Sequence, residues 1–173
     1  MFILNFTIGY CLLYLGLAYL FPLFFTGRRP INVGERISPR VILLIIVVTL
    51  AIFSFTTRIQ DPMIENRLQH ALGGGFLAFF ICFLAARSSG VKITRFQFFF
   101  FSFLIATALG VANEILEYFL QTYTSLHFAS SVTDTWLDLV SNTVGILIAA
   151  AIFLPFRRRL EEGEEEGVRM KGS

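Results

Sequence analysis

Polar and ionisable side chains recur at helical spacing inside the apolar stretches of this 173-residue chain. They fall into three sets, separated by three or four residues: Arg67, His70 and Gly74; Gly110, Glu114, Glu117 and Gln121; and Asp134, Asp138 and Asn142. In an α-helix, such intervals place the side chains on one face. Carboxylates and an imidazole gathered in this way can bind a cation, accept hydrogen bonds from a ligand or transfer protons.

Five apolar segments hold or flank these residues. A helix rises about 1.5 Å per residue and the hydrocarbon core of a membrane is about 30 Å thick, so one crossing needs roughly 20 apolar residues. Apolar residues make up 55% of the chain, and 21 of them are phenylalanine, which does not suit a soluble domain. The expected spans are Phe2–Phe25, Val41–Thr57, His70–Ala86, Phe96–Leu120 and Thr135–Phe156. The sequence therefore predicts an all-α, multi-pass bundle of five transmembrane helices in the cell membrane.

Basic residues are distributed unevenly between alternate connectors. Of the 14 Lys and Arg residues, only Arg58 and Arg67 lie between the second and third spans, whereas the others lie in the first connector, in the third connector and after the last span. Because Lys and Arg accumulate on the cytoplasmic side, we predict an outside N-terminus and a cytoplasmic C-terminus. Residues 1–156 would form the membrane domain and residues 157–173 a charged, disordered tail. The net charge of +2 is too small to indicate a nucleic-acid partner.

This direction brings polar residues of three spans to one depth. Glu114 lies about 27 Å along the fourth span, near its outer end, whereas His70 begins the third span and Asp138 lies near the outer start of the fifth. A carboxylate facing lipid costs at least about 2.5 kcal/mol, so we expect these groups to face one another. Their charge could be neutralised by Arg67, by bound protons, by a divalent metal or by a cationic ligand group. Asp134 could instead cap the fifth helix.

Three motifs resemble the VanZ-like family and the related YjdF-like group of small membrane proteins. They are Arg67 three residues before His70 with Gly73-Gly74-Gly75 after it, Asn113-Glu114-Ile115-Leu116-Glu117, and Asp134, Asp138, Asn142 and Gly145. The similarity covers about residues 61–151. It departs at Glu117, where VanZ-like proteins usually have Gln, and at an outer-loop Arg that this chain lacks. The resemblance implies a cell-envelope protein, and the VanZ-like family is linked to resistance against teicoplanin-type glycopeptides.

Two functions fit these residues. The first is an envelope protein whose outward pocket binds a membrane lipid headgroup, a lipid-linked envelope precursor or a glycopeptide-type ligand. Its expected ligand-binding residues are Arg67, His70, Glu114, Glu117, Asp134, Asp138 and Asn142.

The alternative is a membrane-embedded, metal-dependent hydrolase or transferase of lipid-linked substrates. Its catalytic residues, which are also the candidate ligands of a divalent cation, would be His70, Glu114, Glu117 and Asp138. No zinc-protease or phosphate-loop motif accompanies them. An ion or proton pathway is the third possibility, and it is disfavoured because acidic groups on one side make no relay across about 30 Å.

Overall fold

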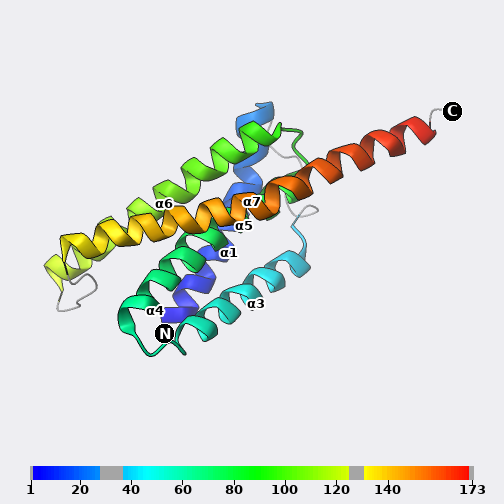
Figure 1. The fold of residues 1–173 in the computed structure, drawn as a ribbon. Coiled ribbons are helices and arrows are strands. Elements are labelled where there is room, and N and C mark those ends of the chain that lie inside the picture. Colours follow the sequence, from blue (N-terminus) through cyan, green and yellow to red (C-terminus); the bar gives the residue numbers. More distant parts are fainter. Residues whose placement is uncertain (1, 28–36, 125–130, 172–173) are drawn as a thin grey trace.

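The computed structural model describes residues 2–27, 37–124 and 131–171, and nearly all of them are helical (Figure 1). The helices are α1 (Phe2–Thr26), α3 (Pro39–Thr56), α4 (Pro62–Gln69), η1 (His70–Leu77), α5 (Ala78–Ser89), α6 (Arg95–Tyr123) and α7 (Val132–Lys171). Because α4, η1 and α5 follow one another without a break, they form one long helix. In the described residues, five helical stretches are long and apolar enough to cross a membrane. The predicted five-helix bundle of a membrane protein is confirmed, whereas its orientation remains a prediction.

Several helix boundaries coincide with glycines and prolines of the sequence. Gly27 follows α1 and Gly90 follows α5, with positive φ angles of 65° and 62° that favour glycine. Pro39 and Pro62 stand at the first turns of α3 and α4, where a missing N–H costs nothing. The Asp61 carboxylate accepts hydrogen bonds from two backbone amides of α4, at 2.9 and 3.3 Å.

The third span is longer than the sequence predicted. It runs over Pro62–Ser89 instead of beginning at His70, and it is the most buried of the five. Hydropathy missed α4 because half of its residues are polar, yet the helix packs against α7 and several of its residues are half-buried. The segment η1 has the wider π-helical turn, which is rare and tends to occur at functional sites.

The fifth helix also differs from the prediction. A continuous α7 reaches Lys171 and projects beyond the other helices in Figure 1, where a disordered tail was expected after Phe156. Glu and Arg dominate this stretch, and both have high helix propensity. The side chains of residues 157–173 and the first connector over 28–36 lie outside the described residues.

Helix α7 packs most extensively against η1. A Cβ atom added to Gly145 would collide with the carbonyl oxygen of Ala71 and lie 2.9 Å from the backbone nitrogen of Phe76. The small residues around Gly73-Gly74-Gly75 therefore allow the close approach of another backbone. This contact fixes the rotation of α7 and so the direction of its polar stripe.

We expect Gly145→Ala to lower the free energy of unfolding by about 1–3 kcal/mol, because the added methyl group has backbone on its contact side and cannot be accommodated by a rotamer change. The matched control is Gly16→Ala, since a Cβ at Gly16 meets nothing within 4 Å and the gain in helix propensity is similar. Thermal unfolding of both variants in detergent checks this. Equal melting temperatures for the two variants would contradict the packing described here.

Candidate functional site

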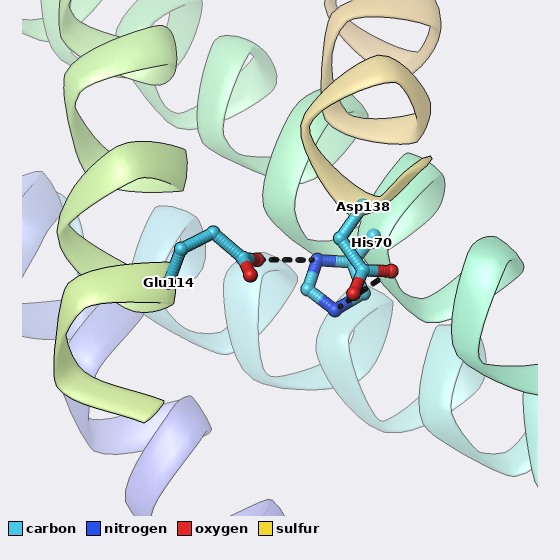
Figure 2. A group of neighbouring side chains, drawn as sticks. All are labelled: His70, Glu114 and Asp138. Carbon is cyan, nitrogen blue, oxygen red and sulfur yellow. Dashed lines mark ion pairs between the residues drawn. The ribbon is translucent and has the colours of Figure 1, made fainter. Parts of the chain in front are cut away.

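Three side chains from three different helices meet in one buried group (Figure 2). The imidazole of His70 on η1 lies between two carboxylates: its Nδ1 is 3.6 Å from Oε1 of Glu114 on α6, and its Nε2 is 3.4 Å from Oδ1 of Asp138 on α7. Only 8% of Glu114 and 1% of Asp138 are exposed. One ligand atom from each residue lies within 4.8 Å of the other two, so the group could hold a metal ion. We call these three residues the His70 cluster.

The guanidinium of Arg67 bridges the two aspartates of α7. It contacts Oδ1 of Asp134 and Oδ1 of Asp138, and it donates a hydrogen bond of 3.2 Å to the carbonyl oxygen of Asp134. The side-chain amide of Asn66 donates a further hydrogen bond of 3.0 Å to Oδ1 of Asp138. Arg67 is thereby committed to α7, and no ion pair joins it to Glu114 in the described part of the chain.

Asn142 lies one helical turn beyond Asp138, between two glycines of neighbouring helices. A Cβ at Gly74 of η1 would collide with Oδ1 of Asn142, and a Cβ at Gly110 of α6 would lie 3.0 Å from its Nδ2. The side chain also lies beside the imidazole of His70. The two glycines therefore provide the space in which Asn142 reaches the edge of the His70 cluster.

Two buried oxygen atoms of the site lack a hydrogen-bond donor among the described residues. They are Oε1 of Glu114 and Oδ1 of Asn142, and each belongs to a residue that is more than nine-tenths buried. Leaving a buried acceptor unsatisfied costs about 1–3 kcal/mol, and more when it is charged. Such atoms mark a place where a ligand could supply the missing partner.

Glu117 does not join the cluster. It is half-buried one turn beyond Glu114, where its Oε1 accepts a hydrogen bond of 2.7 Å from Asn113 on the same helix. The structure thus places six of the seven predicted ligand-binding residues together: Arg67, His70, Glu114, Asp134, Asp138 and Asn142. Whether any of them binds a ligand or catalyses a reaction is still a prediction.

Two local details differ from the sequence-based expectations. Asp134 lies inside the first turn of α7 and not at its N-cap position, because the helix already begins at Val132, and the hydroxyl of Ser131 accepts a 3.2 Å hydrogen bond from the Asp134 amide. Asn66 was not predicted as part of the site. Its position four residues before His70, on the same helical face, was the signal that could have found it.

Exposed aromatic side chains surround this end of the bundle. Tyr118 and Tyr123 lie on the last turns of α6, and Trp136 lies on the first turns of α7, all three with more than half of their surface exposed. In Figure 1 the end of α6 and the start of α7 lie together at one end of the bundle. Tyr and Trp are enriched where helices leave the hydrocarbon core, and this pattern favours a membrane interface at this end of the bundle.

A family model described as "Predicted membrane protein (DUF2238)" matches residues 66–159, which is just over half of the chain and includes the whole His70 cluster. It identifies neither a VanZ-like nor a YjdF-like family, and it gives no support to a role in glycopeptide resistance. No curated protein and no solved structure matches the chain.

Proposed function

The chain belongs to the DUF2238 family of predicted membrane proteins, and we propose that it binds a cationic ligand at the non-cytoplasmic face of the cell membrane. The ligand would bind at the acidic cluster within the membrane helices. The observation that carries this proposal is Glu114, whose carboxylate is buried and has an oxygen without a hydrogen-bond donor among the described residues.

The charge balance of the site favours a cation. Four carboxylates lie on the polar stripes of α6 and α7, whereas Arg67 is the only permanent cation in contact with them in the described residues. Even a protonated His70 would leave the acidic charge in excess. A buried ion without a counter-charge is strongly destabilising, so a bound cation beside Glu114 would stabilise the folded protein.

The outward direction is supported by the distribution of Lys and Arg, which favours a non-cytoplasmic position for the start of α7 and the end of α6. A cluster at that depth meets lipid headgroups, lipid-linked envelope precursors and free ions. The cation could therefore be the ammonium group of a headgroup or a divalent metal ion, since either would place positive charge next to Glu114. An envelope role follows from this position.

The test uses the full chain in lipid nanodiscs, with thermal unfolding as the readout. One arm compares phosphatidylethanolamine, whose ammonium donates hydrogen bonds, with phosphatidylcholine, whose ammonium cannot. The other arm adds Zn²⁺ or Mn²⁺ to phosphatidylcholine nanodiscs. A ligand at 100 times its Kd adds about 2.7 kcal/mol of stability, so at least one arm should raise the melting temperature clearly.

The matched variants are Glu114→Gln and Glu117→Gln, which remove the same charge one turn apart on α6. We expect the increase in melting temperature to disappear in Glu114→Gln and to persist in Glu117→Gln, because Glu117 is already bonded to Asn113. An equal increase in both variants, or no increase in either arm for the unmodified chain, would contradict cation binding at this site.

A membrane-embedded hydrolase or transferase is the second candidate function, favoured by the position of His70 against Asp138. A carboxylate on one imidazole nitrogen orients the ring, and the other nitrogen can then accept a proton from an attacking water. In this candidate the chain would hydrolyse a phosphoester of a lipid-linked substrate in nanodiscs. The substitution His70→Gln should abolish this hydrolysis. A His70→Gln variant that hydrolyses the substrate as fast as the unmodified chain would contradict the hydrolase candidate.

A further inference from the structure

We propose that the His70 cluster is a divalent transition-metal site, in which His70, Glu114 and Asp138 are the protein ligands and Asn142 Oδ1 is an adjacent oxygen donor. This inference rests on the proposed function, because it chooses the metal ion over the lipid ammonium as the bound cation. The three ligands come from η1, α6 and α7, so the ion would also join three helices.

The donor set determines the class of metal. One imidazole nitrogen with two carboxylate oxygens is typical of zinc, iron and manganese sites, whereas magnesium and calcium prefer sites made of oxygen alone. No thiolate takes part, because neither Cys11 nor Cys82 belongs to the cluster. Zinc is the most informative probe, since it accepts nitrogen and carboxylate ligands together and has no redox chemistry.

The unpartnered oxygens, one in the His70 cluster and one on the neighbouring Asn142, are a second observation at this site. Oε1 of Glu114 is the atom that faces the imidazole, and Oδ1 of Asn142 lies beside the same ring. Both atoms are buried acceptors without a hydrogen bond of normal geometry in the described residues, and the group that each one faces is the imidazole of His70. A metal ion next to His70 would provide a positive partner for both at once.

The required adjustment of the ligand atoms is small. Zinc lies about 2.0–2.2 Å from its nitrogen and oxygen ligands in a tetrahedral arrangement, so neighbouring ligand atoms are about 3.3–3.6 Å apart. The three ligand atoms of the His70 cluster lie within 4.8 Å of one another, so they would have to approach by about 1 Å. At present each imidazole nitrogen faces a different carboxylate (Figure 2). Glu114 has the longest and most flexible side chain of the two acids, and rotation about its side-chain bonds can bring it to the nitrogen that faces Asp138.

Asp138 is already oriented as a metal ligand would be. Arg67 and Asn66 both bond its Oδ1, and hydrogen-bonded partners of this kind hold ligating carboxylates in place. Gly74 and Gly110 leave the space that the side-chain amide of Asn142 occupies, because a side chain at either position would displace that amide.

The experiment measures zinc binding by the purified full chain in detergent after treatment with a chelator. Zinc is titrated against a competing chromophoric chelator, and metal content is measured by mass spectrometry after gel filtration. We expect one zinc per chain. Glu114→Gln and His70→Gln should each weaken binding at least about 100-fold, because loss of a ligand should exceed the 10–100-fold cost of losing an outer partner. Glu117→Gln is the control, and its affinity should stay within a few-fold of the unmodified chain.

The outcomes separate the inference from the proposed function. If the unmodified chain takes up no zinc, manganese or iron, yet is stabilised by phosphatidylethanolamine through Glu114, the metal site is wrong and the binding of a cationic ligand stands. If neither cation has any effect, both are wrong. Zinc that binds equally to Glu114→Gln and to the unmodified chain lies elsewhere, and it would overturn the metal site. Gel filtration and melting curves confirm that each variant is folded.

Discussion

Replacing Arg67 by methionine is expected to lower the free energy of unfolding by about 3–5 kcal/mol, because it leaves two carboxylates of α7 without their counter-charge. Asp138 is only 1% exposed and cannot recover the lost interaction from water. Methionine retains much of the length of the arginine side chain, so the effect reports the charge more than the packing. Unfolding of the variant in detergent by heat or denaturant measures the change.

The matched rescue replaces both aspartates with asparagine in the Arg67→Met background. Removing the two uncompensated carboxylate charges should restore most of the lost stability, because the triple variant then has neither the buried cation nor the buried anions. Arg58→Met is the control, because Arg58 has no ion pair in the described residues. A loss of stability that persists in the triple variant would show that Arg67 acts through packing and not through its charge.

A reporter enzyme that functions only in the cytoplasm should be active when fused after Ser173 and inactive when fused before Met1. The basis is the distribution of Lys and Arg: twelve of the 14 lie on the face that carries the first connector, the third connector and the segment after the last span. Basic residues near the ends of spans determine orientation, so the difference between the two fusions should be nearly all or none.

A matching pair of fusions to an enzyme active only in the periplasm of a bacterial host provides the control and should give the opposite pattern. Reporter activity in the cytoplasm from the N-terminal fusion alone would show that the orientation is the opposite of the predicted one. The His70 cluster would then lie beneath the cytoplasmic surface, and an envelope role would have no basis.

The five spans could be predicted because length and hydropathy are local properties. Gly27, Pro39, Pro62 and Gly90 break the helices where the backbone requires it, and each of these positions could be read from the sequence. The polar α4 was missed for the same reason: hydropathy cannot recognise a membrane-associated helix whose polar face is covered by a neighbour.

The meeting of His70, Glu114 and Asp138 followed from spacing and direction, because antiparallel helices of known rise bring particular residues to one level. Which side chains bond to one another at that level could not be predicted from the spacing. Which acid contacts Arg67 depends on the rotation of α7, which is set by the contact of Gly145 with Ala71. Glu117 shares a stripe with Glu114, yet it bonds to Asn113 because it lies one turn further along α6.

Imidazole nitrogen NMR tests the central claim most directly, because the chain has only two histidines and His127→Gln leaves His70 as the single signal. With ¹⁵N-labelled histidine in nanodiscs, stoichiometric Zn²⁺ should shift one imidazole nitrogen of His70 strongly and the other weakly. The same shift should appear in Glu117→Gln and be absent in Glu114→Gln. An unchanged His70 spectrum at saturating zinc would contradict a metal ion held between η1, α6 and α7.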